Sequence, residues 1–159
     1  MADPGLLGRD GEREAIGQLL ATARLGVSRT LVITGEAGVG KTSLLEDAES
    51  GLEGMRALRA TGLEAERHLP FAGLLQLLRP ALDHLDALAP PQAAALAGAL
   101  GLARPEPGSG DRFMIGAAVL GLLSRYAEEG PVAVLVDDLH ALDLPSAEAV
   151  VFTARRLAA

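Results

Sequence analysis

The chain has 159 residues, of which 49% are hydrophobic and only 3% aromatic, and its net charge is −7. This length suits a single domain whose core is built mainly from aliphatic side chains. The absence of cysteine excludes disulfides and thiolate metal sites, and the lack of a dense Lys/Arg cluster argues against direct binding of nucleic acid by this segment.

Apolar periodicity and Gly/Pro breaks predict helices that alternate with short strands. In chain order, the pattern predicts a helix over 12–24, a strand over 29–34, a helix over 41–50, a strand over 55–61, a polar loop over 62–70, a helix over 71–85 interrupted at Pro80, a helix over 91–100, a loop over 103–111, a helix over 111–129 capped by Asp111, a strand over 132–136 and a helix over 146–157. This alternation predicts an α/β domain with a mainly parallel sheet.

A glycine-rich segment, GEAGVGKT, follows the first predicted strand and fits the pattern G-x-x-x-x-G-K-[ST]. The glycines let the backbone fold closely around phosphate oxygens, and the N-terminus of the following helix adds partial positive charge. We therefore expect a nucleotide-binding loop, or P-loop, followed by the first residues of a helix. Its residues are Gly35, Glu36, Ala37, Gly38, Val39, Gly40, Lys41, Thr42 and Ser43.

The basic residues of the chain include a single lysine. Of fourteen basic side chains, only Lys41 is not arginine, and it lies inside the glycine-rich segment. A compact ammonium on a flexible stem suits a site where a planar guanidinium does not fit. We expect Lys41 to reach the β- and γ-phosphates of ATP or ADP and Thr42 to ligate Mg²⁺.

Two adjacent carboxylates, Asp137 and Asp138, end the apolar run VAVLV. Like charges placed side by side at the end of a buried strand are costly unless positive charge lies nearby. Mg²⁺ and Lys41 would supply that charge, so we expect Asp137 to hold the metal, through a bound water, and Asp138 to orient or activate the attacking water. The alternative is that Asp138 is a solvated carboxylate or caps the next turn.

Four blocks of the sequence together resemble a known family. They are LLGRDGEREAIGQLL, VITGEAGVGKTSLL, RATGLEAERHLPFAGLLQLLRPAL and VLVDDLHALDLPSAEAVVFTARRL, in that order. They resemble the N-terminal ATPase region of large LuxR-family bacterial transcriptional regulators, which are STAND-type signal-transducing ATPases similar to the origin-recognition-type AAA ATPase domain. The resemblance implies a three-layer P-loop fold and a nucleotide switch that couples ATP binding and slow hydrolysis to oligomerisation.

The resemblance also implies an incomplete sheet. We expect residues 1–159 to form one partial domain, divided into a lead and helix (1–28), the P-loop unit (29–61), a helical insertion (62–130) and the Asp137 strand with its helix (131–159). In the related fold another strand lies between the P-loop strand and the Asp137 strand. Without it, orphaned backbone groups would make the chain marginally stable, aggregation-prone and weak in nucleotide binding. The alternative is direct pairing of 132–137 with the P-loop strand.

Other positions near these motifs allow more than one role. The block LLGRDGERE either covers adenine through Leu6 and Leu7 or is a simple lead with Arg9 solvated. His140 either senses the γ-phosphate or, as we favour, holds its loop. The family usually has Trp where this chain has Ala141, which puts the geometry beyond Asp138 in doubt.

Two enzymatic functions and one non-enzymatic function fit these features. The first is the regulatory ATPase switch, with a homo-oligomer as its expected partner. The second is a small-molecule P-loop kinase, although the region 62–112 offers few polar groups to read an acceptor. The third is a truncated nucleotide binder without activity. No signal-like N-terminus or membrane-length apolar run is present, so we expect a cytoplasmic location.

Overall fold

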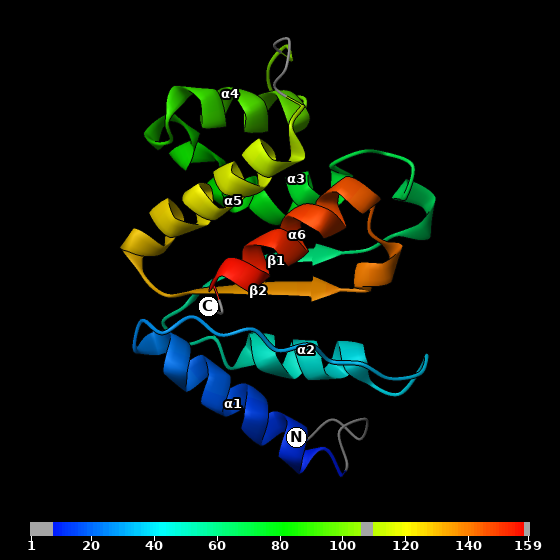
Figure 1. Cartoon of the computed structure of the whole chain (residues 1–159). Coiled ribbons are helices and arrows are strands. Elements are labelled where there is room, and N and C mark those ends of the chain that lie inside the picture. The colour runs from blue at the N-terminus through cyan, green and yellow to red at the C-terminus, as the bar shows by residue number, and fades with distance from the viewer. Residues whose placement is uncertain (1–7, 106–109, 158–159) are drawn as a thin grey trace.

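A two-stranded parallel sheet lies between two layers of helices in the computed structural model, which describes residues 8–105 and 110–157 (Figure 1). The helices are α1 (Asp10–Arg24), α2 (Lys41–Ser50), α3 (Ala72–Leu78), α4 (Pro90–Ala99), α5 (Arg112–Tyr126) and α6 (Leu144–Leu157). Helices α1 and α2 cover one face of the sheet, and the other four lie on the opposite side. The expected three-layer α/β architecture is therefore confirmed.

Strands β1 (Arg56–Thr61) and β2 (Val132–Asp137) pair in parallel from end to end, so that Thr61 lies opposite Asp137. Side chains alternate between the two faces of each strand. Ala133 and Leu135 pack with Leu44 and Ala48 of α2 in the smaller core. Leu58 of β1 is fully buried in the larger core on the opposite face.

The long crossover from β1 to β2 builds most of the larger core. Its helix after Phe71 changes character near Pro80, because α3 ends at Leu78 and the chain continues as a 3₁₀ helix, η3 (Arg79–Ala87). Proline lacks the N–H that an α-helix needs and clashes with the preceding turn, which explains the predicted interruption. The cap predicted for α5 is confirmed, since Asp111 accepts a hydrogen bond from the backbone N–H of Phe113 (3.0 Å).

The strand predicted over 29–34 is wrong. Residues 27–36 have no regular secondary structure, and Leu31 and Val32 are 46% and 73% exposed. A strand is stabilised by hydrogen bonds to a neighbouring strand. Within the described residues, β2 pairs with β1 rather than with this segment.

Direct pairing of 132–137 with the P-loop segment, the alternative considered from the sequence, is therefore also wrong. Most of the unpaired segment is exposed, so water can satisfy its backbone groups and the expected cost of orphaned groups does not arise there. The segment still exposes apolar side chains, Leu31 and Val32 among them. The expected tendency to aggregate stays a prediction.

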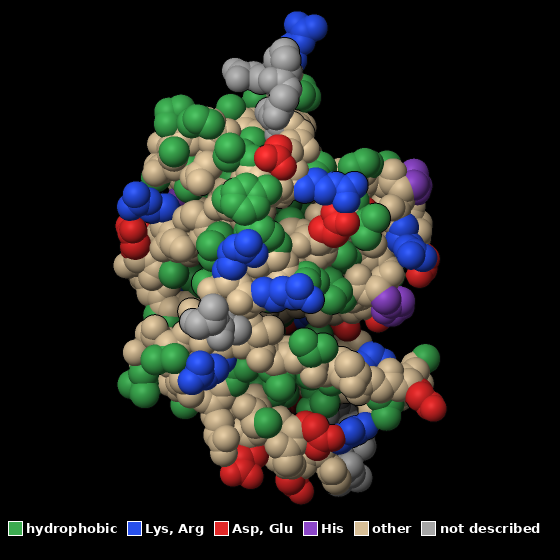
Figure 2. All heavy atoms as spheres, in the orientation of Figure 1, with side chains coloured by type: hydrophobic (Ala, Val, Ile, Leu, Met, Phe, Trp, Pro, Cys, Tyr) green, Lys and Arg blue, Asp and Glu red, His purple; other side chains and the backbone are tan. Residues whose placement is uncertain are grey.

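Charged side chains are mixed on the surface. Figure 2 shows Lys and Arg scattered among acidic and hydrophobic side chains on the face of Figure 1, rather than gathered in one patch. Among the helices of the described ranges, each falls short of the length and apolarity that a bilayer crossing requires.

Candidate functional site

The glycine-rich loop leads directly into α2, as the motif requires. Gly38 and Gly40 have φ angles of 78° and 90°, in the left-handed region that glycine adopts without a steric penalty. Gly40 is the residue before the first turn of α2, and residues 35–39 are exposed. The exposed loop and the start of the helix are thus open to an anion.

Lys41 folds back into this loop. Its Nζ donates hydrogen bonds to the carbonyl oxygens of Gly35 (3.0 Å) and Glu36 (2.9 Å). The ammonium is therefore held by two neutral acceptors at the loop. Phosphate oxygens are stronger acceptors for an ammonium because they carry charge, so these residues fit a nucleotide phosphate chain.

Arg9 contacts the same loop from the N-terminal side. Its guanidinium donates to the carbonyl oxygen of Val39 (2.7 Å) and pairs with Glu12 (2.6 Å). The alternative that Arg9 is simply solvated is therefore wrong. Leu6 and Leu7, expected to cover adenine, lie outside the described residues.

Asp137 lies on the face of the sheet that α2 covers. It follows Ala133 and Leu135 at intervals of two and is 6% exposed, and its Oδ1 accepts a hydrogen bond from the N–H of Asp138 (2.9 Å). Strand β2 ends on the side of the molecule where α2 begins (Figure 1). Asp137, the last residue of β2, and Lys41 and Thr42, the first residues of α2, therefore lie on the same side of the molecule in adjacent layers.

The side chain of Asp138 does not continue the row of side chains on the α2 face of the sheet. Its φ of 47° places a non-glycine residue in the left-handed region, and its side chain is 45% exposed. The exposed His140 lies with Nδ1 3.9 Å from Asp138 Oδ1, which is too long for a hydrogen bond, so the favoured idea that His140 holds the loop gains no support. In the described chain, no hydrogen bond joins residues 35–43 to Asp137 or Asp138.

Sequence reasoning missed two buried polar residues just beyond this loop. Asp143 is 3% exposed and accepts hydrogen bonds from the backbone N–H groups of Phe71 (2.8 Å), Gly73 (3.0 Å) and Ser146 (3.0 Å). The fully buried Ser146 accepts one from the N–H of Leu74 (2.8 Å) through Oγ. An aspartate three residues before a serine at a helix start is a capping signal, although its reach to α3 is visible only in the fold.

These hydrogen bonds change the acidity of Asp143. Burial raises the pKa of its carboxyl group, but the hydrogen bonds from Ser146 and from the N–H groups of Gly73 and Phe71 favour the charged form and outweigh burial. The pKa of Asp143 therefore lies below its ordinary value.

We predict that this group makes stability depend on pH in the acid range. A carboxyl whose pKa is lowered by folding stabilises the protein above its unfolded pKa of about 4, and that stability is lost as pH falls toward the folded pKa. The difference in unfolding free energy between wild type and Asp143→Asn should be constant above about pH 5 and shrink below it. Urea denaturation from pH 3 to 7 measures this, and a difference that stays constant through the acid range would contradict it.

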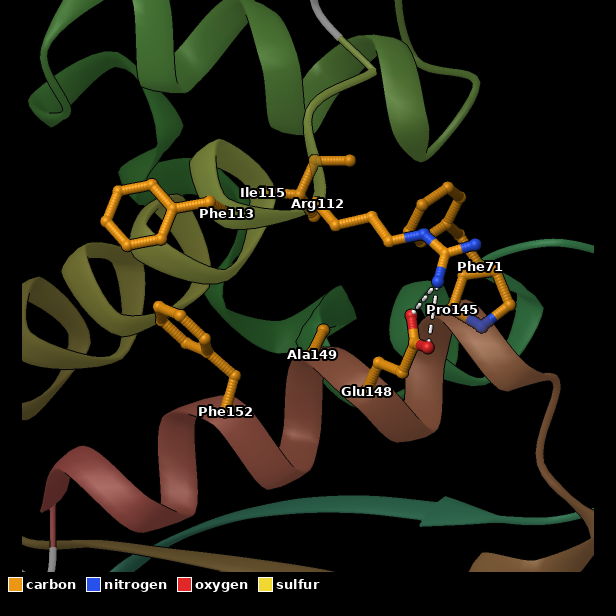
Figure 3. Close-up of a pocket in the computed structure, with 8 residues that line it drawn as sticks. All are labelled: Phe71, Arg112, Phe113, Ile115, Pro145, Glu148, Ala149 and Phe152. Atoms are coloured by element: carbon orange, nitrogen blue, oxygen red, sulfur yellow. Dashed lines mark hydrogen bonds and ion pairs between the residues drawn. The ribbon is translucent and has the colours of Figure 1, made fainter.

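A hollow of about 260 Å³ lies between α5 and α6 (Figure 3), and residues 35–43, Asp137 and Asp138 are not among those that line it. Its lining consists of Phe71, Arg112, Phe113, Ile115, Pro145, Glu148, Ala149 and Phe152. The Arg112 guanidinium pairs with both carboxylate oxygens of Glu148, at 2.8 and 2.6 Å, so the main charges of the hollow neutralise each other. The hollow does not suit a polyphosphate.

Comparison with known proteins supports the P-loop interpretation. The sequence profile of the AAA ATPase domain matches residues 5–159, nearly the whole chain. No curated protein and no solved structure matches it. The profile match indicates nucleotide binding.

Proposed function

Because the chain belongs to the AAA ATPase domain family, we propose that it is an ATP-binding, Mg²⁺-dependent switch domain that hydrolyses ATP slowly. The observation that carries this proposal is the position of Asp137. Its carboxylate follows Leu135 on the face covered by α2, at the end of β2 that lies on the same side of the molecule as the start of α2 and its loop.

Each residue of the proposed site has a distinct role. The loop amides of residues 35–41 and the Lys41 ammonium bind the phosphates, with Lys41 exchanging its two carbonyl partners for phosphate oxygens. Thr42 and Asp137 hold Mg²⁺, which neutralises charge on the phosphates when bound. Asp138, with its exposed carboxylate, orients the attacking water and accepts its proton.

The regulatory part of the proposal rests on the resemblance of the four sequence blocks to LuxR-family STAND regulators. We propose that the nucleotide state of this cytoplasmic domain controls self-association and, through it, a response elsewhere in a regulator. A switch of this kind releases phosphate to water, whereas a small-molecule kinase would pass it to an added acceptor.

We predict that Lys41→Ala lowers affinity for Mg-ATP about tenfold to a hundredfold, because it removes charge-assisted hydrogen bonds to phosphate. Lys41→Arg should also weaken binding, since a planar guanidinium replaces the compact ammonium. Titration calorimetry with Mg-ATP measures both changes.

Arg155→Ala is the matched control, because it removes one exposed positive charge near the end of α6, on the other side of the view in Figure 1 from the start of α2. Its affinity should equal that of the wild type. Equal affinity of wild type and Lys41→Ala would refute the assignment of the P-loop.

A further inference from the structure

The buried carboxylate of Asp143 has no role in the proposed chemistry, yet it connects three parts of the fold. Its hydrogen bond to the N–H of Ser146 caps α6, and those to Phe71 and Gly73 hold the start of α3, some seventy residues earlier in the chain. Ser146 completes the connection through Leu74. The start of α3 is thus fixed by the residues that open α6.

The loop between Asp137 and Asp143 is packed closely against two glycines. Gly62, directly after β1, donates its N–H to the carbonyl oxygen of Asp137 (2.9 Å), and a Cβ at Gly62 would lie 2.1 Å from the carbonyl oxygen of Asp138. On the other side, a Cβ at Gly73 would lie 2.4 Å from Leu142 Cδ2. The loop therefore has backbone or core packing on both sides.

The loop itself is short and internally bonded. The N–H of Ala141 donates to the carbonyl oxygen of Asp138 (2.8 Å), closing the 3₁₀ turn η5 (Leu139–Ala141). Leu142 is buried. Only this one turn separates Asp143 from Asp138, so a displacement of Asp143 shifts the backbone of Asp138. The left-handed conformation of Asp138 is strained and persists only while the surrounding contacts hold it.

We propose that Asp143, assisted by Ser146, is a positioning residue that holds the backbone of Asp138 in its left-handed conformation. The hydrogen bonds to Phe71 and Gly73 fix the far end of the loop, and β2 fixes the near end. The role of this geometry in ATP hydrolysis rests on the proposed function, but the mechanical connection does not.

The test uses Asp143→Asn in the nucleotide-free chain. An amide has one acceptor oxygen, so an NH₂ group would face an N–H donor in place of the second carboxylate oxygen. Leu96→Ala is the matched control, because it destabilises the same core from α4, and Leu96 is fully buried there. Hydrogen exchange at the amides of Asp138, Ala141 and Leu142 is the readout.

We expect these amides to exchange about tenfold faster in Asp143→Asn and to be little changed in Leu96→Ala under conditions where both variants are folded. Ser146→Ala, which removes one acceptor, should show the same pattern more weakly and serves if Asp143→Asn fails to fold. Faster exchange confined to residues 71–74, or equal effects in the control, would overturn the proposal.

A second measurement separates this inference from the proposed function. If the wild type binds and hydrolyses ATP, Asp143→Asn should lower turnover per bound nucleotide while affinity stays close to that of the wild type. A loss of binding sites without loss of turnover per site would indicate only a structural role and overturn the positioning role. If the wild type binds no nucleotide, the proposed function fails and hydrogen exchange alone decides the inference.

Discussion

Replacing Gly62 with alanine should both destabilise the protein and disturb Asp138. The added Cβ would lie 2.1 Å from the carbonyl oxygen of Asp138, 2.7 Å from the nitrogen of Leu142 and 2.8 Å from the carbonyl carbon of Ala141. All three are backbone atoms, so no side chain can rotate away, and the loop must shift. We expect a loss of about 2–3 kcal/mol in unfolding free energy, at the upper end of overpacking effects.

Urea denaturation followed by circular dichroism measures this loss. Gly17→Ala is the matched control, because Gly17 is a solvent-exposed residue in the middle of α1 and a Cβ there would meet no atom within 4 Å. Replacing glycine with alanine inside a helix should stabilise the control by about 0.5–1 kcal/mol. If Gly62→Ala were as stable as wild type, the close packing of the loop against β1 would not exist in solution.

The parts of the fold with local causes could be predicted from the sequence. Helix α2 begins at Lys41 and ends at Ser50 as expected, because the glycine-rich turn and Gly51 limit it on either side. The cap at Asp111 and the break at Pro80 also depend on residues within one turn of them. The motif likewise identified the candidate phosphate-binding residues.

The parts that depend on distant partners could not be predicted. The run over 29–34 has the composition of a strand, but a strand needs a neighbour, and β2 is paired with β1 instead. In the sequence, Asp143 is indistinguishable from an ordinary helix N-cap. Its burial and its hydrogen bonds to Phe71 and Gly73 arise only when the crossover returns to the sheet. Local pattern therefore located the candidate chemistry but not the residues that support it.

The two adjacent carboxylates should respond differently to neutralisation. Asp137→Asn should remove most of the tightening that Mg²⁺ gives to nucleotide binding, because the buried carboxylate on the α2 side of the sheet is the proposed metal-holding group. Asp138→Asn should leave affinity nearly unchanged and lower turnover by about a hundredfold to ten-thousandfold, the range expected for loss of a general base. Titrations with Mg²⁺ and with EDTA measure the first effect, and single-turnover phosphate release measures the second.

The reason for the difference lies in the geometry of neighbouring residues on one strand end. Asp137 continues the inward alternation of Ala133 and Leu135, whereas the left-handed φ of Asp138 turns its side chain toward solvent. Asp86→Asn, which neutralises a carboxylate in η3, controls for the change in net charge and should alter neither measurement. If Asp138→Asn removed the tightening by Mg²⁺ while turnover per bound nucleotide persisted, the two roles would have to be exchanged. Since the exposed Asp138 carboxylate could then not serve as the base, the water would need activation by Asp137 from within the sheet.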